Sequence, residues 1–169
     1  MAFGTGNHET TRMCIEFLID HRNLFSKHET LIDLGCGSGI LSLVAKRLGY
    51  VDILGVDNDP DAVRISNENA FLNDISNGVD FKISDLSNMD IGKEKYDCIV
   101  GNIQADILQL CCKQINLLAK DESVIILSGI LSEEIDEVID RFLKENSPRL
   151  QNYKVKTSGE WSSVLFSRF

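Results

Sequence analysis

Hydrophobic residues along the chain occur either in short continuous runs or at helical spacing. Short apolar runs that end in glycine or polar residues are typical of strands buried in a parallel sheet. Apolar residues that recur every three or four positions predict amphipathic helices between those runs. We therefore expect helices over residues 10–20, 38–48, 60–72, 106–119 and 132–144, and strands over residues 31–34, 52–56, 79–84, 96–100, 123–127, 153–157 and 161–169.

The alternation of strands and helices predicts an α/β fold. An open, mostly parallel sheet of seven strands, with helices on both faces, buries the apolar side of each element. Only a short turn at Ser158 and Gly159 joins the last two strands. A parallel connection needs a dozen or more residues, so these two strands are expected to form an antiparallel hairpin. The length of 169 residues favours a single domain.

A glycine-rich segment after the first strand is the first candidate for a binding site. Asp33 precedes Gly35, Gly37 and Gly39, and helical sequence follows. The glycines let a ligand approach the backbone, and the first N–H groups of the helix face it. The dinucleotide fingerprint would need its third glycine at position 40, where the chain has Ile40. The spacing resembles instead the first motif of class I methyltransferases, which bind S-adenosylmethionine (SAM); a tight turn without a ligand is the alternative.

Polar residues follow other predicted strands, at the sheet edge where open α/β folds bind ligands. Asp57, after the second strand, is placed to bind both ribose hydroxyls, as an acidic residue does in nucleotide folds. A solvated carboxylate is the alternative interpretation of Asp57. Asp85 or its neighbour Leu86, after the third strand, could meet the adenine edge, although aspartate after a strand is also a common turn former.

Asn102, after the fourth strand, is the candidate catalytic residue. Methyl transfer from a sulfonium needs little acid–base help, because the leaving group departs as a neutral thioether, so the protein mainly positions the nucleophile. An amine nucleophile must be neutral, and carbonyl acceptors that bind its N–H groups aim the lone pair at the methyl group. Asn102 and the backbone after it can supply those acceptors. Alternatively, Asn102 caps the helix that starts near Ala105.

Charge and composition narrow the class of partner. The net charge is −9 and the pI is about 4.8. A broad nucleic-acid surface needs clustered Lys and Arg, so direct nucleic-acid binding is not expected, whereas a basic protein substrate fits this charge. No apolar run is long enough for a membrane helix, and the N-terminus has no signal-peptide pattern. The five cysteines have no zinc-type spacing and predict reduced, buried thiols of a cytosolic protein.

Taken together, these motifs resemble the PrmA family of ribosomal protein L11 methyltransferases. The resemblance is carried by residues 2–11, 33–41, 55–60, 102–105, 127–131 and 159–161, and it spans almost the whole chain. It implies a three-layer, Rossmann-like class I fold, with SAM as cofactor and S-adenosylhomocysteine (SAH) as product. It also implies a cytoplasmic enzyme that methylates the α-amino group and lysine ε-amino groups of a ribosomal protein.

The resemblance extends the set of cofactor residues. It implies that Phe3, Gly4, Thr5, Gly6 and Thr11 contact SAM, as do Gly35, Asp57 and Asn102. The predicted cofactor site also includes Asp33, Gly37, Gly39, Asn58 and Asp85, and no metal is expected. The family's Thr-His-Pro-Thr-Thr is here Asn7-His8-Glu9-Thr10-Thr11, so proline is replaced by glutamate and the loop is expected to be less rigid. His8 acts either as a general base or through a hydrogen bond that orders this loop.

The family also has an N-terminal domain that recognises the ribosomal protein. We expect residues 1–169 to be the catalytic domain without it, and a monomer is favoured. Two other functions stay open. One is methylation of another amine or amide, in a small molecule, a protein glutamine or a nucleic-acid base, but residues 102–105 lack the prolines and the stacking aromatic residue usual in the last two groups. The other is a non-catalytic binding module with a SAM-type fold.

Overall fold

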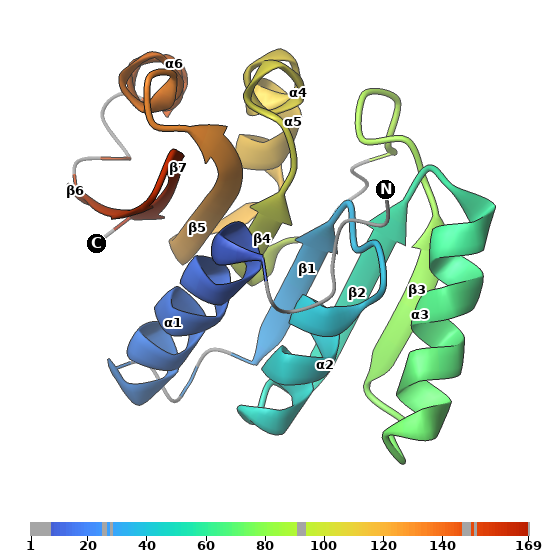
Figure 1. The fold of residues 1–169 in the computed structure, drawn as a ribbon. Coiled ribbons are helices and arrows are strands. Elements are labelled where there is room, and N and C mark those ends of the chain that lie inside the picture. The colour runs from blue at the N-terminus through green and yellow to red at the C-terminus, as the bar shows by residue number, and fades with distance from the viewer. Residues whose placement is uncertain are drawn as a thin grey trace.

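The computed structural model describes residues 8–24, 27, 29–90, 94–146, 150 and 152–168. Seven strands form one sheet in the order β3-β2-β1-β4-β5-β7-β6 (Figure 1). The strands are β1 (Thr30–Leu34), β2 (Asp52–Asp57), β3 (Val79–Ile83), β4 (Tyr96–Asn102), β5 (Ala119–Leu131), β6 (Asn152–Ser158) and β7 (Trp161–Ser167). The helices are α1 (Glu9–Leu24), α2 (Ile40–Arg47), α3 (Pro60–Leu72), α4 (Ala105–Leu110), α5 (Cys112–Leu117) and α6 (Ile135–Asn146).

The sheet is parallel from β3 to β5 and ends in an antiparallel hairpin. Strand β7 pairs with β5 on one side and with β6 on the other, antiparallel in both cases. The predicted α/β class, the mostly parallel seven-stranded sheet and the C-terminal hairpin are therefore confirmed. The strand order reverses between β1 and β4, and ligands bind beside such a reversal in open sheets of this kind.

Two layers of helices cover the sheet. Helices α1, α2 and α3 lie on one face and α4, α5 and α6 on the other (Figure 1). Phe17 and Leu18 of α1 and Leu41 of α2 pack in the first core, whereas Leu108 of α4 and Phe142 of α6 pack in the second. Because both faces of the central strands are buried, those strands are continuously apolar, which is the pattern that identified them in the sequence.

The segment predicted as one helix over residues 106–119 differs in the structure. Helix α4 ends at Leu110, and α5 begins anew at Cys112, because Cys111 leaves helical geometry. Ala119 belongs to β5, where it pairs with Tyr96. The helical period of the sequence could not show this long-range pairing. The polar residues that follow Ala119 hid the first half of the strand, which is longer than the predicted 123–127.

The predicted N-cap of the last helix is also wrong. Ser132 lies in a turn, where its hydroxyl contacts Ser162 at 2.9 Å, and α6 starts only at Ile135. The carbonyl of Glu134 accepts the hydrogen bond from Val138 N that opens the helix. By contrast, the predicted cap of α3 is confirmed, because Asp59 accepts a hydrogen bond from Asp61 N and Pro60 occupies the first helical turn.

A buried carboxylate joins three strands at the amino end of the parallel sheet. Asp97 Oδ2 accepts hydrogen bonds from Glu29 N, Thr30 N and Thr30 Oγ1, at 3.0, 2.9 and 2.8 Å. Asp97 Oδ1 pairs with Lys120 Nζ at 2.9 Å. Burial alone would raise the pKa of Asp97, but these hydrogen bonds outweigh it and lower the pKa to about 2.

All five cysteines are free and buried. Burial raises the pKa of every one of these thiols, to about 12 at Cys36 in the glycine loop, so none is a ready nucleophile. Over the part of the chain that the structure describes, none of the helices combines the length and the apolar character needed to cross a membrane.

Candidate active site

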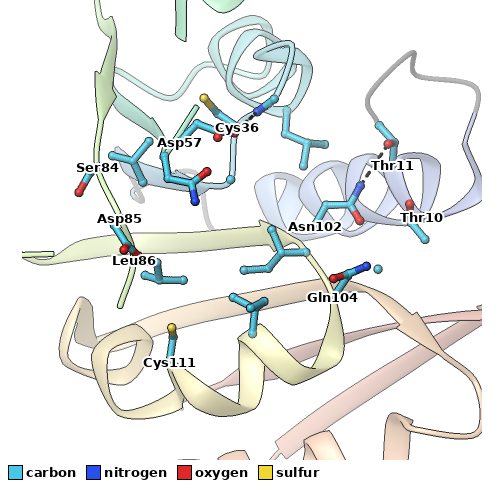
Figure 2. A pocket seen from close by; sticks show the side chains of 18 of the residues that line it. Thr10, Thr11, Cys36, Asp57, Ser84, Asp85, Leu86, Asn102, Gln104 and Cys111 are labelled. Atoms are coloured by element: carbon cyan, nitrogen blue, oxygen red, sulfur yellow. Dashed lines mark hydrogen bonds between the residues drawn. The ribbon is translucent and has the colours of Figure 1, made fainter. Parts of the chain in front are cut away.

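A cavity of about 590 Å³ opens at the carboxyl ends of the parallel strands (Figure 2). It lies where the strand order reverses, as expected for this kind of sheet. Of the predicted cofactor residues, those that line it are Thr11, Gly35, Gly37, Asp57, Asn58, Asp85 and Asn102. Phe3, Gly4, Thr5 and Gly6 lie outside the described residues.

The glycine loop is fastened to the end of β2. Gly37 N donates to Asp57 Oδ2 at 2.9 Å, and Cys36 N donates to the carbonyl of Val56 at 2.9 Å. Asp59 N donates to the other carboxylate oxygen of Asp57 at 3.0 Å. Each carboxylate oxygen still has an acceptor position left, because it can accept two hydrogen bonds. Asp57 can therefore hold the loop and bind a pair of hydroxyls at the same time.

Two residues of the predicted motif support the loop from behind and do not line the cavity. Asp33 is 1% exposed, and its Oδ2 accepts hydrogen bonds from Ser42 N at 3.1 Å and Ser42 Oγ at 2.7 Å. Burial raises the pKa of Asp33 to about 6, although these hydrogen bonds oppose the shift. Gly39 has φ +81° and packs against Ser66 of α3. Because Gly39 is left-handed, α2 begins at Ile40 and not at the predicted Ser38.

The far end of the cavity is formed after β3. Asp85, Leu86 and Cys111 line it (Figure 2). Ile107 of α4 also lines the cavity. Asp85 Oδ1 accepts hydrogen bonds from Ser87 N and Ser87 Oγ, at 2.9 and 2.7 Å, and these lower the pKa of Asp85. Asp85 therefore forms the turn that its position suggested, and it also faces the cavity beside an apolar surface suited to an aromatic base.

Asn102 lies at the end of β4 and lines the cavity. Its Nδ2 donates to Thr11 Oγ1 at 3.2 Å, which fixes the amide against the first turn of α1 (Figure 2). The residue at the N-cap of α4 is Gln104, so Asn102 does not cap that helix. The alternative role considered for Asn102 is therefore excluded. The side-chain oxygen Oδ1 of Asn102 is the polar group that the site offers next to the backbone of Ile103.

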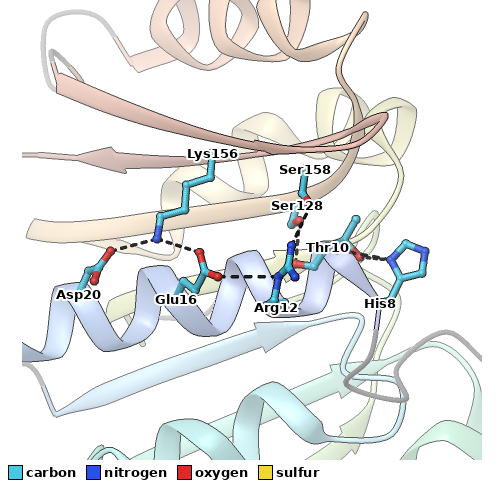
Figure 3. Close-up of polar contacts among 8 residues, drawn as sticks. All are labelled: His8, Thr10, Arg12, Glu16, Asp20, Ser128, Lys156 and Ser158. Atoms are coloured by element: carbon cyan, nitrogen blue, oxygen red, sulfur yellow. Dashed lines mark hydrogen bonds and ion pairs between the residues drawn. The ribbon is translucent and has the colours of Figure 1, made fainter.

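The first turn of α1 is ordered by His8. His8 Nδ1 lies 2.7 Å from Thr10 Oγ1 and accepts a weaker hydrogen bond from Thr10 N at 3.4 Å, in the manner of an N-cap (Figure 3). The His8 ring also packs edge-on against Trp161, with ring centroids 5.4 Å apart. These contacts favour the loop-ordering role for His8. They hold Thr10 and Thr11 at the cavity wall.

Ion pairs and a hydrogen bond fasten the rest of α1 to the C-terminal hairpin (Figure 3). Lys156 Nζ of β6 lies 3.1 Å from both Glu16 and Asp20. Arg12 Nη2 donates to Ser158 Oγ at 2.8 Å. Because α1 carries Thr11, these contacts connect the hairpin to the position of Asn102.

The cavity residues that were not predicted as site residues include Gln104, Gly129 and Trp161. All three belong to the segments 102–105, 127–131 and 159–161 that carried the family resemblance, so the resemblance was the signal that could have found them. Because they are far apart along the chain, the sequence alone did not show that all three line one cavity. No group of three or more His, Cys, Asp or Glu side chains within the described ranges is arranged to hold a metal ion.

Comparisons with known proteins agree with this geometry. The sequence profile of the family "Ribosomal protein L11 methyltransferase (PrmA)" matches residues 1–168. The chain is 40% identical over 165 residues to the ribosomal protein L11 methyltransferase of Alkaliphilus metalliredigens, covering 98% of the chain and 50% of that protein. It is 40% identical over 167 residues to the enzyme of that name from Ruminiclostridium cellulolyticum, covering 98% of the chain and 51% of that protein. The chain thus spans about half the length of the curated relatives it matches.

Solved structures give the same result. The crystal structure of the ribosomal protein L11 methylase from Lactobacillus delbrueckii subsp. bulgaricus matches with a TM-score of 0.84 and 29% identity, over 99% of this chain and 81% of that one. A SAM-dependent methyltransferase from Clostridium acetobutylicum, 14% identical with a TM-score of 0.74 over 96% of this chain and 93% of that one, shares the fold. The fold is that of the class I SAM-dependent methyltransferases, and the chain belongs to the ribosomal protein L11 methyltransferase (PrmA) family.

Proposed function

We propose that this chain is the catalytic domain of a SAM-dependent N-methyltransferase that modifies the α-amino group and lysine ε-amino groups of ribosomal protein L11. The observation that carries this proposal is the single cavity in which Asp57, the glycine loop and Asn102 meet. A cofactor-binding half and an amine-binding half lie side by side there. The protein substrate is proposed from the relatives, which are ribosomal protein L11 methyltransferases by name.

The residues of the cavity fit SAM. Asp57 would bind the ribose hydroxyls, and the backbone at Gly35 and Gly37 would lie against the amino-acid tail. Gly35 has φ +68°, and a Cβ there would lie 2.5 Å from the Ile103 side chain, so only glycine leaves the loop open. Leu86 and Ile107 offer an apolar surface for adenine, next to Asp85. SAM, when bound, supplies the electrophilic methyl group.

The rest of the reaction depends on placing a neutral amine. Asn102 Oδ1 and the carbonyl oxygen of Ile103 can accept hydrogen bonds from the two N–H groups of the amine. This arrangement turns the lone pair of the amine toward the methyl group. The hydrogen bond from Asn102 Nδ2 to Thr11 keeps the amide from rotating away. No strong base is required. Solvent can take a proton from the substrate ammonium ion before the transfer, and from the methylated amine after it.

The surface around the cavity favours a basic partner. Exposed acidic side chains at the carboxyl end of the sheet include Asp59, Asp85, Asp106, Glu133 and Glu160. With a net charge of −9, this end of the molecule should attract lysine-rich segments and repel nucleic acid. We also propose that the protein is cytoplasmic and monomeric, as expected from its sequence.

The proposal is tested in two steps. Calorimetric titration with SAM and with SAH should give dissociation constants in the micromolar range. Incubation of the chain with isotope-labelled SAM and recombinant L11, followed by peptide mass spectrometry, should then place label on the α-amine and on lysines. Acetylated L11, with all amines blocked, is the matched control and should stay unlabelled.

The outcomes separate the remaining functions. SAM binding without transfer to L11, but with transfer to another amine, would mean that this domain acts on a different substrate. SAM binding without transfer to any amine would mean that the chain is a binding module. Absence of SAM and SAH binding would contradict the proposal altogether.

A further inference from the structure

Gly129 lies directly beside the two oxygens proposed to bind the amine. It is on β5, opposite the end of β4, and it lines the cavity. A Cβ at position 129 would lie 2.8 Å from the Ile103 carbonyl oxygen and 3.1 Å from Asn102 Oδ1. Both oxygens therefore converge on one point, and that point is empty because residue 129 has no side chain.

The backbone around Gly129 is irregular and firmly anchored. The pairing of β5 with β7 shifts register between Leu127 and Ile130, which marks a bulge at Ser128 and Gly129, and Gly129 has φ +81°. The carbonyl of Ser128 accepts the hydrogen bond from Ile103 N at 3.1 Å. Ser128 Oγ donates to the carbonyl of Thr10 at 3.1 Å and also contacts Ser163 Oγ. The bulge cannot move aside without disturbing α1, β4 and β7 together.

A side chain at position 129 would therefore displace the acceptors and not the bulge. The nearest atom is a backbone carbonyl oxygen, which can retreat only if the Ile103 peptide plane rotates. That rotation would turn the carbonyl away from its place beside Asn102 Oδ1. A misplacement of about 1 Å in such a group is enough to slow a positioned reaction by about 100-fold.

We infer that Gly129 is a positioning residue for methyl transfer: its missing side chain allows Asn102 Oδ1 and the Ile103 carbonyl to lie together as a two-oxygen acceptor for the substrate amine. This inference rests on the proposed function, because a paired acceptor matters only for an amine that must present its lone pair. The three atoms nearest a Cβ at position 129 belong to Asn102 and Ile103, and none belongs to the glycine loop or Asp57, which are proposed to hold the cofactor.

Gly129→Ala and Gly129→Asn test the inference, with Gly49→Ala and Gly49→Asn as matched controls. Gly49 also has positive φ, +94°, but it lies after α2, and its nearest neighbour is the flexible end of the Arg22 side chain at 3.2 Å. Alanine at either site incurs the same kind of backbone strain, which asparagine relieves because it tolerates left-handed geometry. Alanine and asparagine each place a Cβ against the two acceptor oxygens at position 129, but not at position 49.

For Gly129→Ala and Gly129→Asn alike, we expect kcat for methyl transfer to L11 to fall by about 100-fold. The dissociation constant for SAM should change less than about threefold, which is under 1 kcal/mol. Both Gly49 variants should keep the unmodified kcat, while the alanine variants at the two sites lower Tm by a few degrees each. A crystal structure of Gly129→Ala should show the Ile103 carbonyl rotated away from Asn102 Oδ1.

The inference is overturned if Gly129→Asn restores kcat, because backbone strain would then be the cause. It is also overturned if kcat of Gly129→Ala equals that of Gly49→Ala, or if the Ile103 carbonyl stays in place in the crystal. Failure of the unmodified chain to methylate L11 would contradict the proposed function instead. The position of the Ile103 carbonyl in Gly129→Ala would still decide whether Gly129 sets the geometry of the acceptors.

Discussion

Asp57 Oδ2 accepts a hydrogen bond from Gly37 N at 2.9 Å, so the carboxylate at the end of β2 holds the loop at the end of β1. This contact joins two neighbouring strands at the edge of the sheet where the cavity opens. Asp57 Oδ1 meanwhile accepts from Asp59 N at the start of α3. The side chain proposed to bind ribose thus already has a fixed orientation, which reduces the entropy lost when a ligand is bound.

Replacing Asp57 should mainly weaken cofactor binding. Asp57→Ala removes the proposed ribose contacts and releases Gly37, and a hydrogen bond to a charged group contributes about 1.5–3 kcal/mol, so SAM affinity should fall by about 10- to 100-fold. Calorimetric titration with SAM measures the loss. Asp52→Ala, at the exposed start of the same strand, is the control and should bind SAM normally. Unchanged SAM affinity in Asp57→Ala would refute the assigned role.

Asn102 should affect the chemical step more than cofactor binding. Asn102→Ala removes one acceptor for the amine and its tie to Thr11, so kcat is expected to fall by about 100-fold or more. SAM affinity should change much less than in Asp57→Ala. Single-turnover kinetics with L11 and calorimetry separate the two quantities, and Gln104→Ala, which removes another amide from the cavity wall, is the control. Equal losses of SAM affinity in the Asn102 and Asp57 variants would contradict this division of roles.

Local sequence predicted the parts of the fold that depend on local physics. The apolar runs of the central strands, the cap of α3 by Asp59 and the left-handed glycines of the loop all follow from neighbouring residues. The break at Cys111 and the start of β5 at Ala119 did not, because Ala119 is fixed by its pairing with Tyr96, far away in the chain. The turn that delays α6 depends likewise on the contact between Ser132 and Ser162.

The candidate site shows the same division. Strand-end residues such as Asp57 and Asn102 could be found because parallel strands bring their carboxyl ends to one edge. Asp33 belongs to the motif, yet the structure places its carboxylate under α2 against Ser42, since the side chain points to the buried face of β1. The closeness of Gly129 to Asn102 arises from a bulge, and no spacing in the sequence reveals a bulge before the strands are paired.

The buried Asp33 predicts a pH dependence of stability. Its pKa is raised to about 6 chiefly by burial, whereas an unfolded aspartate titrates near 4. Between these values the folded state binds more protons than the unfolded state, so the free energy of unfolding falls as pH rises from about 4 to 6 and is then constant. The side chain at position 33 in Asp33→Asn is neutral at every pH. The free energy of unfolding of this variant should therefore rise relative to that of the unmodified chain over this range, by about 3 kcal/mol at most.

Denaturant unfolding at several pH values checks this expectation. The exposed Asp80→Asn provides the control, because it removes a carboxylate without changing a buried group. A constant difference in stability between Asp33→Asn and the unmodified chain from about pH 4 to pH 7 would show that Asp33 does not titrate in this range.

Asp97 should stabilise the fold in the opposite pH range and without any effect on the site. Hydrogen bonds from Thr30, Lys120 and Glu29 overcome the effect of burial and lower the pKa of Asp97 to about 2. Its contribution to the free energy of unfolding is therefore complete above pH 4 and is lost as pH falls from about 4 through 2. Asp97→Asn keeps the shape but loses the charge, and should cost about 2 kcal/mol at neutral pH.

Because Asp97 is the second residue of β4 and Asn102 is its last, the two lie at opposite ends of the strand, and SAM affinity of the folded Asp97→Asn variant should equal that of the unmodified chain. Denaturant unfolding between about pH 3 and pH 7 should show the difference in stability shrinking toward acid, as the unmodified side chain also becomes protonated. A difference that stays constant down to pH 3 would mean that the charge of Asp97 contributes nothing and that only its hydrogen-bonding shape matters. Weakened SAM binding in the folded variant would instead show that the two ends of β4 are coupled, contrary to this expectation.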